Sequence, residues 1–335
     1  MKILVTGGCG YIGSHTVVEL LNNDYEVVII DDFSNSKPEV LEKIEKITKK
    51  KINFYEGDVK NFAILDNIFK EHKIDAVIHF AGFKAVGESV EKPLKYYSNN
   101  LISTLNLCEI MTKNNVKNLV FSSSATVYGE PKKLPIKEDF PVISATNPYG
   151  ETKIMIERVL EDLYKSDNSW NIAILRYFNP IGAHPSGLIG EDPNGIPNNL
   201  MPYINKVAIR ELKELSVFGN DYDTIDGTGV RDFIHVVDLA IGHIKALEWT
   251  SSRNGIDAFN LGTGMGYSVL QLIQTFKKVN HIDIPYKVVD RRAGDIAACY
   301  ADVTHASEKL NWISKYNIED MVKDSYNYIK TNKKI

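Results

Sequence analysis

Tyr149 and Lys153 stand four residues apart in the segment Tyr-Gly-Glu-Thr-Lys, and a phenol beside an ammonium group can move a proton. Residues at positions i and i+4 share one helix face, so we expect the two side chains to lie together. A free tyrosine has a pKa of about 10, too high for a base at neutral pH. A cation about 4 Å away supplies about 4 kcal/mol at an effective dielectric constant of about 20, enough to bring that pKa near 7. The pair therefore predicts a base, although unrelated Tyr and Lys residues show the same spacing on surface helices.

A glycine-rich loop near the N-terminus predicts a dinucleotide site. Gly7, Gly10 and Gly13 follow a short apolar strand and open an amphipathic helix, which is the context that this motif requires. Glycines let the backbone approach a pyrophosphate, whose charge then meets the helix N-terminus. Asp31 ends the next strand, where a carboxylate accepts hydrogen bonds from a ribose. Asp31 and Asp32 would repel a 2′-phosphate, which favours NAD over NADP.

The elements that must position these residues alternate between strand and helix. Apolar runs predict buried parallel strands at residues 3–5, 27–30, 52–55, 76–78, 119–121 and 172–175. Helical patterns lie between them, at residues 11–22, 38–49, 61–72 and 94–115. This order predicts an α/β fold with a Rossmann-type doubly wound parallel sheet and a ligand at the carboxyl ends of its strands.

The texture of the sequence changes after Phe178, where residues 179–199 are rich in Pro, Gly and Asn. We expect an NAD-binding domain at residues 1–178 and a smaller mixed α/β substrate domain at residues 179–335. The chain is expected to re-enter the first domain near residues 231–249. In the second domain, short strands are predicted at residues 216–218, 259–261 and 287–289. Ser268 is the expected N-cap of a helix that begins at Val269, so the preceding glycine run reads as a turn.

Composition excludes several classes of function. The formal net charge of −4 argues against a nucleic-acid or acidic-membrane surface. Three widely spaced cysteines, Cys9, Cys108 and Cys299, predict no structural metal site and suit a reducing cytoplasm. The apolar run at residues 3–5 is too short for a signal-peptide core, and no run reaches membrane-spanning length.

The motifs together resemble the extended short-chain dehydrogenase/reductases. Longer strings narrow the match to members that epimerise UDP-hexoses at C4: residues 79–89, 176–180, 182–187, 195–200 and 227–232. The resemblance runs from about residue 1 to residue 330. It implies that Tyr149 is the base, that Lys153 holds the nicotinamide ribose and stabilises the phenolate, and that Ser124 hydrogen-bonds the sugar hydroxyl or Tyr149. The sugar carbon would give a hydride to tightly bound NAD, which leaves a transient 4-keto sugar. This sugar would rotate to present its other face and then take the hydride back.

The motifs and the resemblance place two overlapping sets of residues around the ligands. Cofactor-binding residues are expected at Gly7, Gly10, Tyr11, Ile12, Gly13, Asp31, Asp32, Phe33, Ser34, Asn35, Ser36, Asp58, Val59, Phe80, Ala81, Gly82, Lys84, Asn99, Ser124, Tyr149, Lys153 and Phe178. Residues around the UDP-sugar are expected at Lys84, Ser124, Tyr149, Asn179, Asn199, Leu200, Ser216, Phe218, Arg231, Arg292, Asp295 and Cys299. By the resemblance, Cys299 stands where a bulky Tyr restricts other members to plain hexoses. UDP-GlcNAc and UDP-GalNAc are therefore expected substrates as well.

The same residues allow two alternative functions to be weighed, and the resemblance also implies an oligomeric state. Dehydratases and decarboxylases of the family place acids beside the Ser or Thr after strand five, whereas this chain has Ala125 and Thr126, which favours epimerisation. A non-catalytic dinucleotide sensor would not need the Tyr149/Lys153 pair. The resemblance also implies a homodimer, formed by helices at about residues 94–115 and 149–165.

Overall fold

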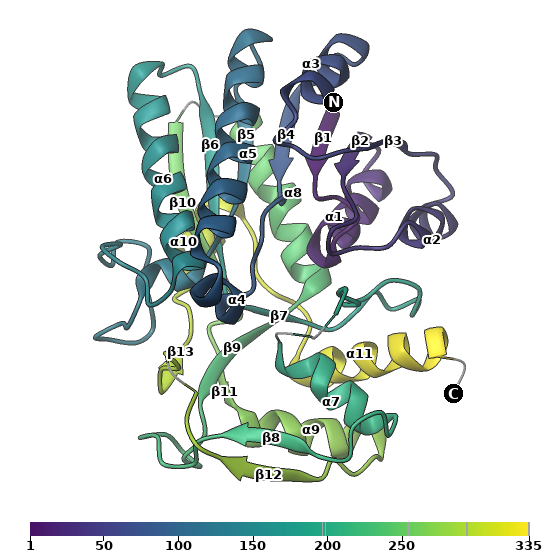
Figure 1. The fold of residues 1–335 in the computed structure, drawn as a ribbon, viewed down its shortest axis with the longest axis vertical. Helices are drawn as coiled ribbons and strands as arrows, with labels where there is room; N and C mark the ends of the chain where they lie inside the picture. Colours follow the sequence, from purple (N-terminus) through teal and green to yellow (C-terminus); the bar gives the residue numbers. More distant parts are fainter. Residues whose placement is uncertain (196, 198, 253–254, 293, 334–335) are drawn as a thin grey trace.

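A seven-stranded parallel sheet forms the centre of the larger part of the molecule (Figure 1). The structure is a computed structural model that describes residues 1–195, 197, 199–252, 255–292 and 294–333. The strands of this sheet are β1 (Lys2–Thr6), β2 (Glu26–Asp31), β3 (Asn53–Glu56), β4 (Ala76–His79), β5 (Asn118–Ser124), β6 (Asn171–Tyr177) and β10 (Gly255–Leu261). Their order is β10-β6-β5-β4-β1-β2-β3, and each neighbouring pair runs parallel.

Helices cover both faces of this sheet, because its strands are apolar on both sides. In β1, Ile3 and Val5 face one core while Leu4 between them faces the other, and all three are fully buried. The first face carries α1 (Tyr11–Asn22), α2 (Glu39–Thr48), α8 (Val236–Ser252) and α10 (Thr304–Leu310). The second face carries α3 (Phe62–Glu71), α5 (Pro93–Lys113) and α6 (Pro148–Ser166). Two short helices, α4 (Val86–Glu91) and the 3₁₀ helix η1 (Ala125–Tyr128), follow β4 and β5.

The smaller part, below the large sheet in Figure 1, is built from short strands and three helices. One sheet contains β7 (Asn179–Ile181), β9 (Val230–His235), β11 (Gly266–Ser268) and β13 (Ala298–Cys299). A parallel pair is formed by β8 (Leu215–Phe218) and β12 (Tyr286–Val289). These strands share a core with α7 (Leu200–Ala208), α9 (Val269–Asn280) and α11 (Ile318–Lys333).

The predicted fold class is confirmed, and the differences are local. β10 contains the strand predicted at residues 259–261 in the smaller domain, but it pairs with β6 and completes the large sheet. Because strand pairing is a long-range choice, the short apolar run could not reveal it. Helix α4 was not predicted, since six residues with Gly87 in the first turn carry little periodic signal. Ser268 is the N-cap of α9, as predicted, and forms a capping box with Gln271. In the described part of the chain, no helix is both long and apolar enough to cross a membrane.

Candidate active site

The glycine loop places the N-terminus of α1 at the carboxyl edge of the large sheet. Gly7 has φ +70°, and a Cβ there would lie 2.9 Å from the Ala81 nitrogen. A Cβ on Gly13 would lie only 2.2 Å from the Gly7 carbonyl oxygen. Gly10 is the N-cap and brings no side chain to the first N–H groups of α1. These donors and the close backbone therefore fit the pyrophosphate of a dinucleotide.

Asp31 sits at the end of β2 and ties two loops together. Its carboxylate accepts hydrogen bonds from the Cys9 and Phe33 nitrogens, each at 2.9 Å, and from the Ser36 hydroxyl at 2.8 Å. Burial raises the pKa of this carboxyl, and the three hydrogen bonds oppose that rise. Asp32 lies on the exposed side of the same loop and accepts from the Ser34 nitrogen. The two carboxylates thus flank the position where a ribose and any 2′-phosphate would sit.

The other residues predicted around NAD lie mainly in loops that follow strands, and Asn99 lies on α5. Most lie at the ends of strands or in the loops that follow, at the carboxyl edge of the sheet: Val59, Phe80, Ala81, Gly82 and Phe178. Asp58 follows β3, is partly exposed and pairs with Lys60 at 3.3 Å. Asn99, on α5, donates to the Asn100 side chain, which in turn accepts from the Phe83 nitrogen after β4. These hydrogen bonds order the loop after β4.

Helix α6 brings Tyr149 and Lys153 together in the interior. Asn147 is its N-cap, whose side chain accepts from the Gly150 nitrogen at 2.9 Å, and Pro148 is its first residue. Both side chains are buried, and the Lys153 Nζ lies 5.9 Å from the centre of the Tyr149 ring. The Lys153 ammonium donates to the Ser122 carbonyl at 2.6 Å. Sequence reasoning missed this acceptor, because a backbone carbonyl has no side-chain signal.

The electrostatics of the pair differ from the sequence prediction. Burial raises the pKa of Tyr149, and a hydrogen bond with the Ser124 hydroxyl lowers it only partly. Burial also lowers the pKa of Lys153 to about 8. The sequence-based prediction counted the charge of Lys153 and of a bound oxidised nicotinamide ring but omitted the desolvation of both side chains, which raises the pKa of Tyr149 in the chain alone. The pair does lie on one helix face, as the spacing predicted.

Ser124 ends β5 beside the pair. Its Oγ accepts from the Thr126 nitrogen at 3.3 Å, which caps η1, and it also reaches Tyr149. Ser124 therefore caps the 3₁₀ helix and also hydrogen-bonds the candidate base, Tyr149. Its neighbours at the start of η1 are Ala125 and Thr126, which bring no carboxylate.

The residues predicted around UDP gather on the smaller part of the molecule. Ser216 and Phe218 lie on β8, and the Arg292 guanidinium stands over the Phe218 ring at 4.5 Å. Arg231, on β9, pairs with Asp295 at 3.9 Å and lies directly opposite Cys299 on β13. The others lie on β7 and at the start of α7: Asn179, Asn199 and Leu200. Two arginines and an aromatic ring in one region suit a nucleoside diphosphate.

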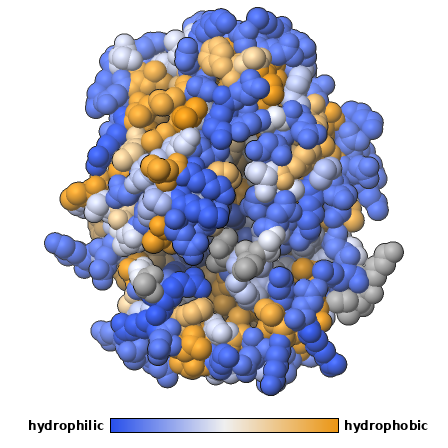
Figure 2. All heavy atoms as spheres, viewed as in Figure 1, coloured by the Kyte–Doolittle hydropathy of each residue, from blue (hydrophilic) through white to orange (hydrophobic). Residues whose placement is uncertain are grey.

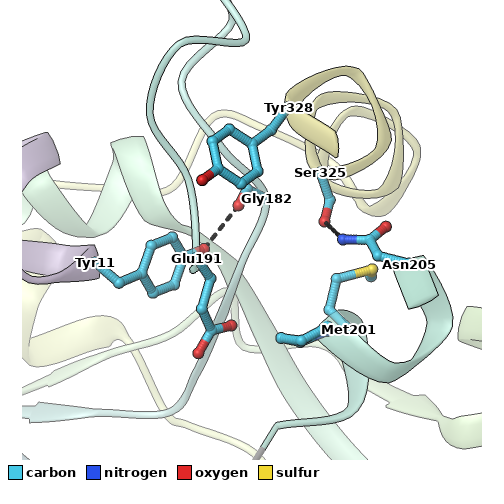
Figure 3. Close-up of a pocket in the computed structure, with 8 residues that line it drawn as sticks. Tyr11, Gly182, Glu191, Met201, Asn205, Ser325 and Tyr328 are labelled. Atoms are coloured by element: carbon cyan, nitrogen blue, oxygen red, sulfur yellow. Dashed lines mark hydrogen bonds between the residues drawn. The ribbon is translucent and has the colours of Figure 1, made fainter. Parts of the chain in front are cut away.

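Glu191 joins the cofactor side to the nucleotide side and was not predicted. Its Oε1 accepts from Lys84 at 3.4 Å and from the Asn199 amide at 2.6 Å. In Figure 3 it lies beside Tyr11, whose hydroxyl donates to the Gly182 carbonyl at 2.8 Å. The glycine loop, the segment after β7 and the start of α7 are therefore tied together around one small cavity of about 10 Å³.

Comparison with known proteins agrees with this geometry. Residues 3–262 match the model of the NAD dependent epimerase/dehydratase family. UDP-glucose 4-epimerase of Bacillus subtilis is 60% identical over 99% of this chain and 98% of its own length. The mouse protein of the same name is 55% identical over 99% and 97%. A crystal structure of UDP-glucose 4-epimerase from Bifidobacterium longum, in complex with NAD+ and UDP, is 54% identical, covers 99% of both chains and superposes with a TM-score of 0.96. The chain belongs to the NAD dependent epimerase/dehydratase family.

Proposed function

We propose that this chain interconverts UDP-glucose and UDP-galactose by inverting the sugar at C4 with bound NAD. The observation that carries the proposal is the buried Tyr149–Lys153 pair, which lies at the carboxyl edge of a sheet whose glycine loop fits a dinucleotide. Relatives at 55–60% identity over nearly the whole chain are UDP-glucose 4-epimerases. NAD, when bound, supplies a reversible two-electron acceptor for the sugar carbon.

The chain's own residues would handle the proton and the nucleotide. Tyr149 takes the proton of the 4′-hydroxyl as the 4-keto sugar forms, and returns it to the same oxygen after the sugar has presented its other face. Lys153 stabilises the phenolate by its charge, and Ser124 orients the phenol or the sugar oxygen by a hydrogen bond. Arg231 and Arg292 hold the diphosphate, so that the UDP end stays fixed while the hexose turns.

Cys299 supports a wider substrate range. Its side chain is short, and burial raises the pKa of its thiol to about 11, with Asp232 adding to the rise and Arg231 opposing it. A thiol that stays protonated is a poor nucleophile, so we assign Cys299 to shape and not to chemistry. The room it leaves beside the sugar would admit an N-acetyl group, and UDP-GlcNAc and UDP-GalNAc are proposed as additional substrates.

The deciding experiment is a coupled assay of the purified protein with four UDP-sugars: Glc, Gal, GlcNAc and GalNAc. Interconversion within both pairs is expected. Turnover of the plain hexoses alone would remove the role of Cys299. Release of a dehydrated or decarboxylated product would replace the epimerase proposal with the dehydratase or decarboxylase alternative.

We further propose that the protein is a homodimer. Leu94 and Leu105 on α5 are exposed, at 81% and 48%, and eleven residues place them on one face after about three turns. Ile102 on α5 and Met155 on α6, a helix that contacts α5, are exposed as well. Figure 2 shows apolar atoms over the upper part of the molecule, where these helices lie. Sedimentation analysis should give a dimer, and Leu105→Asp should give a monomer.

A reducing compartment is proposed as the place of action. None of the three cysteines forms a disulfide, and Cys9 and Cys108 are buried. Thiols persist in the cytoplasm, where glutathione keeps them reduced. Fractionation of the source cells, with immunodetection of the native protein, tests this assignment.

A further inference from the structure

We propose that Glu157 is a positioning residue for the catalytic pair, whose clamped carboxylate keeps Lys153 in its ammonium form beside Tyr149. This inference rests on the proposed function, because it deepens the role given to that pair. Glu157 lies on α6 one turn beyond Lys153, so the two side chains share a helix face. Glu157 is 2% exposed, so solvent screens its charge only weakly.

The Glu157 carboxylate is fixed by the two neighbouring strands. Arg176 on β6 donates to both of its oxygens, at 2.7 and 3.2 Å. Ser123 on β5, between the carbonyl that binds Lys153 and the predicted catalytic Ser124, donates its hydroxyl to the same carboxylate. The position of Glu157 is therefore set by the strands that also set the catalytic residues.

Arg176 is itself held from a second side. It donates to the Tyr128 hydroxyl at 2.9 Å and to the Glu138 carbonyl at 3.1 Å. Although burial opposes its charge, Glu157 holds the pKa of Arg176 above its usual range. The guanidinium thus stays charged and cannot relieve an imbalance by losing a proton.

A count of charges shows why Lys153 needs this carboxylate. Lys153 and Arg176 are two buried cations; Glu157 is the buried anion that pairs with Arg176 and lies one helical turn from Lys153 on α6. One positive charge remains, which the phenolate of Tyr149 would neutralise. Without the Glu157 charge, two buried cations would remain with no buried anion beside them, and Lys153 is the one able to deprotonate.

Among the residues that the structure describes, the other titratable groups beside the catalytic pair are neutral. His79 on β4 faces Lys153, but burial and the lysine's charge lower its pKa to about 3, which leaves it neutral. Tyr177 on β6 and Tyr96 on α5 face Tyr149, and burial raises the pKa of each, so both are neutral as well. The Lys153 ammonium otherwise contacts the Ser122 carbonyl and the Phe121 ring.

The sign of the pH effect follows from this arrangement. Burial lowers the pKa of Lys153 to about 8, and the charge of Glu157 works against that fall. Lys153 is thus an ammonium ion below about pH 8, and turnover is lost as pH rises through this value. Removing an anion lowers the pKa of every acid beside it, so Glu157→Gln should move the alkaline loss of turnover to lower pH by about 1 unit or more.

The experiment compares Glu157→Gln with Glu161→Gln in the NAD-loaded protein. Both changes replace a carboxylate by an amide on α6, but Glu161 is exposed one turn further along. Turnover of UDP-galactose is measured from acid to alkaline pH. Displacement in Glu157→Gln alone supports the proposal. A uniform loss of turnover with an unmoved profile, or an equal displacement in the control, overturns it.

Two further variants separate charge from structure. Glu157→Asp keeps the charge and should restore the native profile. In Glu157→Gln/Arg176→Gln the second cation is also gone, so the alkaline limit should move back towards the native pH, whereas a structural role predicts no return. The ultraviolet absorbance of tyrosinate, taken as the difference from each protein's Tyr149→Phe derivative, should shift to lower pH in Glu157→Gln. This titration needs no substrate, so it tests Glu157 even where no UDP-hexose is turned over.

Discussion

The two sides of the site are built in opposite ways. On the large-sheet side, Tyr149 and Lys153 are buried and held by the chain's own hydrogen bonds. On the nucleotide side, Arg292 is exposed, and Phe218 beneath it is 38% exposed. The first side is preorganised before any ligand arrives, which suits a reaction that requires fixed donors and acceptors. The second side offers charge and a flat ring to a ligand that must still displace solvent.

The largest effect is expected from breaking the preorganised side. Tyr149→Phe should reduce turnover by about three orders of magnitude, because it removes the proton acceptor and leaves the ring's packing. The fold and the bound NAD should survive, as measured by circular dichroism and by nucleotide released on denaturation. Near-normal turnover would remove Tyr149 as the base.

A smaller effect is expected on the nucleotide side. Arg292→Ala should raise the KM for UDP-sugars about 10- to 100-fold with little change in kcat, since a charge-assisted hydrogen bond contributes about 1.5–3 kcal/mol. Arg291→Ala is the matched control. Its guanidinium pairs with Asp221 and stacks on Tyr222. Steady-state kinetics that show equal changes in both variants would contradict the assignment of Arg292.

Cys299 tests how the site distinguishes plain from N-acetylated UDP-hexoses. Cys299→Tyr should abolish turnover of UDP-GlcNAc and keep turnover of UDP-galactose, because the larger ring fills the space beside the sugar. The ratio of kcat/KM for the two substrates is the measurement. A parallel fall in both activities would show that Cys299 does not act through size.

The smallest effect is expected away from both sides. Ser268→Ala removes the N-cap of α9 and should lower the free energy of unfolding by about 1 kcal/mol. Kinetic constants should stay unchanged, as α9 belongs to the core of the smaller part. Urea denaturation followed by circular dichroism gives the stability, and an altered KM would imply that the cap also positions the nucleotide.

Sequence reasoning succeeded where the signal is local. The helix at residues 11–22 and the N-cap at Ser268 were predicted because glycine spacing and capping residues are encoded within a few positions. It failed where the outcome depends on distant partners. Glu191 contacts Asn199 and also Lys84, which is far from it in sequence, and the Ser122 carbonyl becomes an acceptor only because the fold brings Lys153 to it. The desolvation that raises the pKa of Tyr149 was omitted for the same reason, since burial is a property of the folded chain.

The place of β10 in the large sheet limits how the molecule can be divided. A fragment that ends at residue 178 would lack both β10 and α8, leaving β6 as an open edge and one face of the sheet partly bare. Exchange of residues 179–335 as a block between relatives would remove the same two elements. Substrate preference is therefore better altered by substitutions within the intact chain than by exchange of residues 179–335.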